Sequence, residues 1–235
     1  MQEIKADLLC EAVDGVIRAR HSVRAYLDTP VPRALVEDIL TVAARAPSGT
    51  NTQPWNVHVV AGDALQRLIA SVCAVFDADP EHREPGYDEV YLRQYGEPQQ
   101  SYRRQLGKAL YGLMGIGKGD TAAMLAQRRR NFLFFGAPVG LLLTIDRSFG
   151  RGSWADVGMF MQTLMLAARA RGLDTCPQAY WVDYESVVAR EIGWPENQRL
   201  VSGIALGYAD PSAPENRLVS ERAGVDQFTI FHGLD

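Results

Sequence analysis

The stretch RHSVR at residues 20–24 follows a segment expected to be helical. In an extended conformation, side chains alternate between two faces, so Arg20, Ser22 and Arg24 share one face. Two guanidiniums around a hydroxyl suit a phosphate or another delocalised anion, because arginine donates paired hydrogen bonds and keeps its charge. Taken alone, however, these five residues are more typical of a solvated basic turn.

A second polar segment, APSGTNTQPW, follows at residues 46–55. Its prolines bracket small polar residues, and the side chains of Asn51 and Gln53 each offer a donor and an acceptor. That complement matches the mixed polar edge of a flavin or nucleobase ring. Proline, serine, glycine and asparagine are also ordinary loop formers, so the segment gains specificity only in combination with residues 20–24.

The composition limits the class of protein. The 235 residues are 47% hydrophobic and carry a formal net charge of -4, which disfavours a nucleic acid or an anionic membrane as partner. Cys10, Cys73 and Cys176 are widely spaced, which argues against disulfides and zinc sites. The first residues lack a signal-peptide pattern, and the longest apolar stretch is about half of the ~20 residues that a membrane span needs. The sequence therefore predicts a cytoplasmic protein without a bound metal.

Hydrophobic periodicity predicts alternating helices and strands in one domain over residues 1–235. Asp183 is expected to cap a short helix that ends at Gly193. Residues 80–130 lack a sustained apolar face and are expected to form an inserted lid, and residues 211–235 a C-terminal arm that lies on another surface. The expected helices cover residues 7–20, 32–45, 65–76, 101–114 and 157–168, and the expected strands residues 55–60, 138–145 and 200–208.

Other motifs carry less weight. GLMGIGKG at residues 112–119 approaches a phosphate-binding loop, but Gly119 stands where the magnesium-binding serine or threonine is needed. No H-E-x-x-H or G-x-S-x-G pattern is present, so hydrolase chemistry lacks support. The run of arginines at residues 128–130 indicates a solvated face, with an anion site at the mouth of a pocket as the alternative.

Five segments in order resemble the FMN-dependent nitroreductase family. They are RHSVR at 20–24, the loop at 46–55, NFLFFGAP at 131–138, GLDTCP at 172–177 and SER at 220–222. The likeness covers nearly the whole chain, and the lid with NFLFFGAP is most similar to bacterial nitrobenzoate-type nitroreductases. The resemblance implies an α+β fold with a mostly antiparallel central sheet flanked by helices. It also implies a homodimer whose subunits exchange their C-terminal arms.

The resemblance further implies a set of FMN-binding residues. Arg20 and Ser22 hold the phosphate and ribityl chain together with Arg222, whereas Arg24 reaches the N1/O2 edge of the ring. The loop approaches the flavin across the dimer interface, and the backbone after Pro177 presents an amide near N5. The full expected set is Arg20, His21, Ser22, Arg24, Pro47, Ser48, Gly49, Asn51, Gln53, Asn131, Pro177, Gln178, Ala179, Tyr180 and Arg222, with Arg130 as an alternative to Asn131 at the ring edge.

The expected reaction is a ping-pong transfer in which NADPH or NADH reduces the flavin and a small aromatic acceptor, such as a nitroaromatic, then takes the hydride. The cofactor carries the chemistry, so no catalytic side chain is expected. Candidate aromatic walls for the acceptor are Tyr87, Tyr91, Tyr95, Tyr102, Tyr111, Phe134 and Trp181, for which packing within the protein is the alternative. Alternative functions are reductive dehalogenation, enone or quinone reduction, and a flavin-binding module without turnover.

Overall fold

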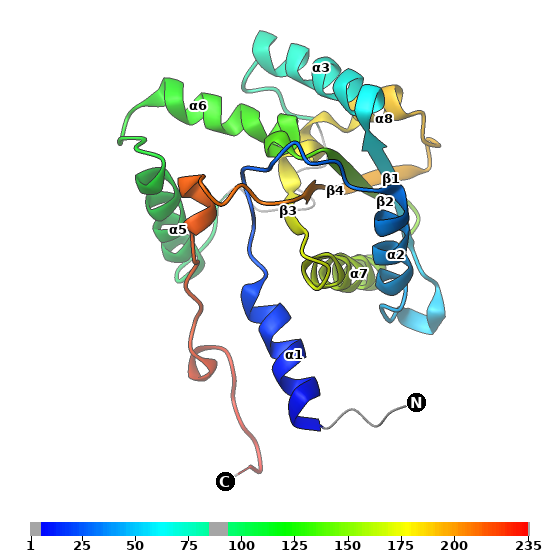
Figure 1. Cartoon of the computed structure of the whole chain (residues 1–235), viewed down its shortest axis with the longest axis vertical. Helices are drawn as coiled ribbons and strands as arrows, with labels where there is room; N and C mark the ends of the chain where they lie inside the picture. The colour runs from blue at the N-terminus through cyan, green and yellow to red at the C-terminus, as the bar shows by residue number, and fades with distance from the viewer. Residues whose placement is uncertain (1–5, 85–93, 235) are drawn as a thin grey trace.

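The computed structural model of the protein describes residues 6–84 and 94–234. Tyr87 and Tyr91, two of the expected acceptor contacts, lie outside the described residues, as do the first five residues of the chain. Within the described ranges the chain alternates helices with strands, and four strands form one sheet (Figure 1). No helix of these ranges is long and apolar enough to cross a lipid bilayer.

The sheet is antiparallel throughout, with the strand order β1-β2-β4-β3. Its strands are β1 (Trp55–Ala61), β2 (Val139–Asp146), β3 (Asp174–Gln178) and β4 (Gln198–Gly207). The predicted α+β class with a mostly antiparallel sheet is therefore confirmed. The three predicted strands correspond to β1, β2 and β4, and β3 was not predicted.

Helices cover both faces of the sheet (Figure 1). One face packs against α2 (Arg33–Ala43) and α7 (Arg151–Arg169), and the other against α3 (Gly62–Ala78) and α8 (Glu185–Ile192). Leu141 and Leu143 of β2 belong to the first core, whereas Leu142 between them belongs to the second. Burial on both faces explains why this strand reads as a continuous apolar run.

Two aromatic residues pack directly onto the sheet where it has no side chain. Phe134, in the 3-10 helix η2 (Arg130–Gly136), stacks on Trp181, in η3 (Ala179–Tyr184), with ring centroids 4.4 Å apart. The Phe134 ring lies over Gly140, where an added Cβ would be 2.6 Å from its Cζ, and the Trp181 ring lies over Gly203 in the same way. These two glycines make room for the stacked pair.

Two helices of the predicted lid stand beside the sheet, and two chain ends project from it (Figure 1). The lid contains α5 (Gln99–Leu113) and α6 (Thr121–Arg129), joined by the turn that had resembled a phosphate-binding loop. The turn η4 (Pro214–Arg217) lies beside α5, and the arm continues from it through η5 (Val225–Gln227) toward the bottom of Figure 1, where α1 (Ala6–Ala19) also extends away from the body. The helix α5 was predicted, and α6 was not.

The prediction that Asp183 caps the short helix is wrong. Asp183 is buried within η3, and one of its oxygens lies 3.5 Å from Nε of Arg83. The helix α8 begins two residues later, and the carboxylate of Glu84 accepts hydrogen bonds from the backbone N–H and the hydroxyl of Ser186, both at 2.7 Å. A carboxylate distant in sequence thus accepts the hydrogen bond from the free N–H group that a local capping residue would accept.

The stacked aromatic pair predicts a large cost for a small substitution. Gly140→Ala should lower the free energy of unfolding by ~1 to 3 kcal/mol, because the new methyl group overlaps Phe134, which is enclosed in the core. Urea unfolding measures the difference. Gly107→Ala in α5, where an added Cβ has no heavy atom within 4 Å, is the matched control and should be no less stable than the parent protein. Equal stability of both variants would contradict the packing described here.

Candidate functional site

The segment at residues 20–24 lies against β3. Ser22 forms a parallel bridge with Thr175, and the backbone N–H of Val23 donates to the carbonyl of Thr175 at 3.1 Å. The side chain of Val23 is fully buried, whereas Ser22 and Arg24 remain partly accessible. The predicted alternation therefore holds where the segment meets the sheet.

The thiol of Cys176 lies among the three polar side chains of this segment. Burial raises the pKa of Cys176 to about 11, although Arg24, a hydrogen bond from Ser22 and Arg20 each act to lower it. The thiol is therefore neutral at physiological pH. As a result, no thiolate offsets the positive charge of Arg20 and Arg24 at this position.

Arg20 and Arg222 form a second positively charged pair. Burial lowers the pKa of the Arg20 guanidinium, and the nearby charge of Arg222 lowers it further. Neither arginine has a carboxylate partner in residues 6–84 and 94–234; Arg222 donates only to the backbone of Ser220 and Glu221 and to the Ser220 hydroxyl. Two like charges held close without an acidic partner favour an anion such as a phosphate.

A cleft of about 600 Å³ opens next to this segment. It brings together three residues predicted from the sequence, Arg24, Asn131 and Tyr180, with Tyr111 of the lid. The helices α5 and α6 form one wall. The remaining lining residues are Pro80, Glu81, Leu110, Thr121, Met124, Leu125, Gln127, Arg128 and Phe135.

Polar atoms without a partner lie behind the cleft and beside the charged segment. The side-chain amide of Gln178 donates to the carbonyl of Asn131 at 2.6 Å, but its buried oxygen has no hydrogen-bond partner in the described chain. The buried hydroxyl of Thr175, which adjoins Ser22, is likewise without a partner there. Because buried polar atoms are almost always hydrogen-bonded, such atoms indicate a polar ligand or water at this position.

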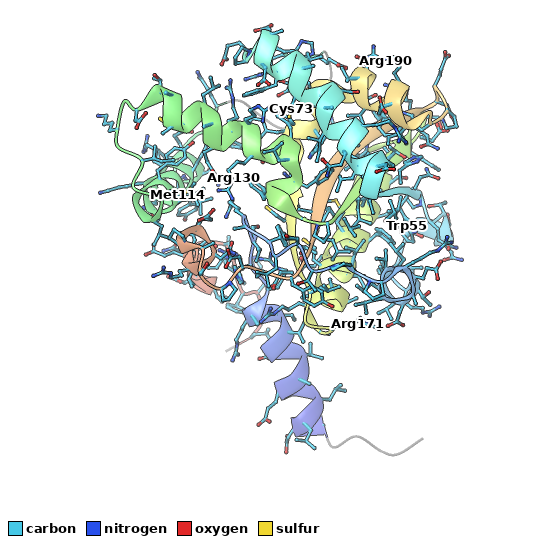
Figure 2. The ribbon with its side chains drawn as sticks, turned by 45° about the horizontal axis from the view of Figure 1, so that its top comes forward. Trp55, Cys73, Met114, Arg130, Arg171 and Arg190 are labelled. Carbon is cyan, nitrogen blue, oxygen red and sulfur yellow. The ribbon has the colours of Figure 1, made fainter. Side chains whose placement is uncertain are left out.

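The loop at residues 47–53 lies elsewhere in the single chain. The backbone N–H of Gly49, in η1 (Gly49–Asn51), donates to the buried carboxylate of Asp156 at 3.2 Å, so the loop is fixed to α7. Asn51 and Gln53 have positive φ angles of 60° and 47° and are exposed. Trp55, at the end of the loop, lies apart from Arg130 in Figure 2, and none of residues 47–53 lines the cleft.

The structure places the other predicted residues as follows. His21 is partly exposed, with Nδ1 3.1 Å from the carbonyl of Ala19. Pro177 lies in β3, and Ala179 begins η3, both partly buried beside Gln178. Pro47 is exposed, and Ser48 accepts a hydrogen bond from the backbone of Gln53 at 3.0 Å.

The predictions for Phe134 and Trp181 need correction. Phe134 and Trp181 are fully buried in the core, so neither has a surface that an acceptor could contact. Tyr102 does not line the cleft, and its hydroxyl bonds to Gln227 of the C-terminal arm at 3.3 Å. Tyr111 does line it.

The prediction that residues 128–130 form a solvated face is wrong, because each of the three arginines bonds to another part of the protein. Arg128 bonds to the carbonyl of Pro80, Arg129 pairs with Asp77 at 2.7 Å, and Arg130 pairs with buried Glu215 at 2.6 Å.

The sequence analysis did not predict three residues near the site, Gln127, Glu215 and Asn216, because nothing in the pattern of residues marks them. No cluster of metal-ligating side chains occurs in the described ranges.

Comparisons with known proteins identify the family of the chain. The model of the nitroreductase family matches residues 17–208. The chain belongs to the nitroreductase family. It is 42% identical to a 4-nitrobenzoate reductase of Pseudomonas putida, over 97% of this chain and 99% of that protein. It is also 39% identical to a nitrobenzene nitroreductase of Ectopseudomonas oleovorans, over 93% and 96% of the two chains.

Solved structures of nitroreductases share the whole fold. The FMN- and NADPH-dependent nitroreductase NfnB of Sphigopyxis sp. strain HMH has a TM-score of 0.91 and 41% identity, covering 94% of this chain and 99% of the other. The FMN-dependent NfnB of Mycobacterium smegmatis, solved in complex with NADPH, has a TM-score of 0.89 and 33% identity over 95% and 99%. The predicted nitroreductase-like fold is therefore confirmed.

The residues of this chain fit FMN. The cofactor carries a phosphate, which matches the uncompensated guanidiniums of Arg20 and Arg222. Its ring has a polar edge of donors and acceptors, which matches the unpartnered oxygen of Gln178 and the side chains of Arg24 and Asn131 at the cleft.

Proposed function

We propose that the protein is an FMN-dependent nitroreductase that oxidises NADPH or NADH and reduces nitroaromatic acceptors. The observation that carries the proposal is the convergence of Arg20, Ser22, Arg24 and Arg222 beside a cleft with polar and aromatic walls. The names of the related proteins support the acceptor class, since they reduce nitrobenzoate and nitrobenzene. NADPH as reductant is supported by the two NfnB structures.

When bound, FMN supplies the hydride chemistry, accepting two electrons from the nicotinamide and passing them to the acceptor. Arg20, Ser22 and Arg222 hold the phosphate end by charge-assisted hydrogen bonds. Arg24 would stabilise, by its fixed positive charge, the negative charge that reduction adds at the N1/O2 edge of the ring. No side chain acts as a nucleophile, and the tyrosines at the cleft enclose a flat acceptor.

The polar ring edge is proposed to meet Asn131 and the segment of residues 177–180. Gln178 is joined to Asn131 by a 2.6 Å hydrogen bond, so the two residues form one rigid unit. The backbone N–H groups of Gln178, Ala179 and Tyr180 lie at the end of β3, where the chain turns into η3 and meets the cleft. This placement supports an amide near flavin N5.

The proposed role of Arg24 predicts a change in redox potential. Arg24→Ala should lower the midpoint potential of the bound flavin by ~30 to 60 mV, because a hydrogen bond to a charged group contributes about 1.5 to 3 kcal/mol and ~30 mV corresponds to about 1.4 kcal/mol. Arg222→Ala should weaken flavin retention and leave the potential nearly unchanged. Spectroelectrochemical titration of the flavin-bound fraction measures both, and a parental potential in Arg24→Ala would contradict the placement of Arg24.

The acceptor class is tested by turnover. Under anaerobic conditions NADPH should reduce the bound FMN once, and continued NADPH oxidation should require an acceptor. Nitrobenzoate or nitrobenzene should be reduced faster than a halogenated phenol, an enone or a quinone. Preference for one of the latter would favour a reductive dehalogenase or an enone or quinone reductase. If NADPH left the bound flavin oxidised, the protein would be a flavin-binding module.

We propose that the protein acts as a homodimer with flavin at the interface. Leu9, Val13 and Ile17 form an exposed apolar stripe on α1, a helix that buries none of its residues. The arm exposes Val219, Val225, Phe228, Ile230, Phe231 and Leu234. Apolar surfaces of this kind normally mark a contact. A second copy would also supply the loop at residues 47–53, since none of these residues lines the cleft beside Arg24 in its own chain.

The dimer proposal predicts linked losses. Ile17→Glu should convert the protein to a monomer and release most of the flavin, because it places a charge in the apolar stripe. Sedimentation velocity with absorbance at flavin wavelengths follows both properties. Glu11→Gln, on the opposite side of the same helix, is the control and should remain dimeric. A parent protein that sediments as a monomer with full flavin content would exclude the interface.

We also propose that residues 80–130 act as a lid. The lid is supported by α5, which buries none of its residues, and by Tyr111 of this helix, which lines the cleft. The arm contacts this lid through the Tyr102–Gln227 hydrogen bond.

We propose that the protein works in the cytoplasm. This location is supported by three unbridged cysteines and by the need for reduced nicotinamide.

A further inference from the structure

Arg130 is the centre of a hydrogen-bond network at the end of α6. One terminal nitrogen of its guanidinium donates to Glu215 at 2.6 Å and to the side chain of Gln127 at 3.1 Å, and the other donates to the carbonyl of Arg24 at 2.7 Å. Figure 2 shows Arg130, the first residue of η2 directly after α6, directed toward the interior of the molecule. A single planar side chain therefore connects the lid, the arm and the segment that carries Arg24.

The neighbour of Glu215 completes the network. The side-chain oxygen of Asn216 accepts from the backbone N–H of Arg24 at 2.8 Å, and its amide donates to the carbonyl groups of Ala25 and Asp210 at 2.8 and 2.9 Å. Both backbone polar groups of Arg24 are thus bound by side chains. The neighbouring N–H of Val23, in contrast, bonds to the backbone of β3.

Burial restricts the geometry of this network. The side chain of Glu215 is 7% exposed and that of Arg130 30%. A buried ion pair gains little net stability, because desolvation offsets much of its attraction. Its geometry, however, is fixed, since a carboxylate left without a partner in such a place is costly.

We propose that Arg130, Glu215 and Asn216 are positioning residues that hold the backbone of Arg24 and thereby direct its guanidinium to the flavin ring. The inference rests on the proposed role of Arg24 at the N1/O2 edge. The three residues act through Arg24 and touch neither cofactor nor acceptor. Because Glu215 and Asn216 begin the arm, the same network sets the point from which the arm leaves the subunit.

A direct electrostatic effect of Arg130 and Glu215 on the flavin would shift the midpoint potentials of the variants in a different pattern from a loss of positioning. Removing the negative charge of Glu215 would then raise the midpoint potential, whereas Arg130→Lys and Asn216→Ala, which change no charge, would leave it unaltered. Loss of positioning lowers the potential in all three variants, since Arg24 is then less well oriented toward the reduced ring. Lysine does not replace Arg130, because it lacks the planar group that spans Glu215 and the Arg24 carbonyl.

The experiment measures midpoint potentials of the FMN-loaded Arg130→Lys, Glu215→Gln and Asn216→Ala variants by spectroelectrochemical titration, each in the parent and in the Arg24→Ala background. In the parent background each substitution should lower the ratio of reduced to oxidised flavin affinity about threefold, which is ~14 mV for a two-electron couple. In the Arg24→Ala background these shifts should vanish, as expected for residues that act through one partner.

Glu185→Gln is the matched control. Glu185 is a largely buried carboxylate paired with Arg147, and Arg147 also donates to the carbonyl of Glu196, but this pair lies by α8 and away from the cleft. Its substitution should leave the potential unchanged. Parental potentials in all three variants, a rise in Glu215→Gln, or shifts that persist in the Arg24→Ala background would overturn the positioning role. If Arg24→Ala itself keeps the parental potential, the proposed function of Arg24 fails instead.

Discussion

The hydrogen bond from the N–H of Val23 to the carbonyl of Thr175 holds the basic segment against the edge of β3. Since Val23 fills the core, its neighbours Ser22 and Arg24 are turned to the other side, beside the thiol of Cys176. This contact brings the positive charges of the segment to the side of the cleft that Arg24 lines. Without it, residues 20–24 would be the solvated turn that their composition alone suggests.

Much of the fold could be predicted because most elements carry their own periodicity. The strand β2 is a continuous apolar run and α7 a long apolar stripe, so each is visible without tertiary information. The strand β3 is not, because its five residues, DTCPQ, include a proline and show no alternation. Its conformation depends on pairing with β4, which no local pattern reveals.

The site was only partly predictable for a related reason. Alternation and the family resemblance identified Arg24 and Asn131, which the structure brings to one cleft. The side chains of Phe134 and Trp181 are of the type that could enclose an aromatic acceptor. Only their packing over glycines of the sheet shows that they belong to the core. Arg130 was considered only for the ring edge, and its hydrogen bonds to Glu215 and Arg24 were not predicted, because these partners are distant in sequence and come together only in the folded chain.

The neutral thiol of Cys176 has a chemical consequence for an enzyme that handles oxidants and electrophiles. The thiolate is the reactive form of cysteine toward peroxides and electrophilic carbon or nitrogen, and a pKa of about 11 leaves almost none of it at cellular pH. A cysteine placed under two arginines would ordinarily be activated. Here burial outweighs the arginines, so the strand that supports the basic segment is protected from sulfenic acid formation and from covalent adducts.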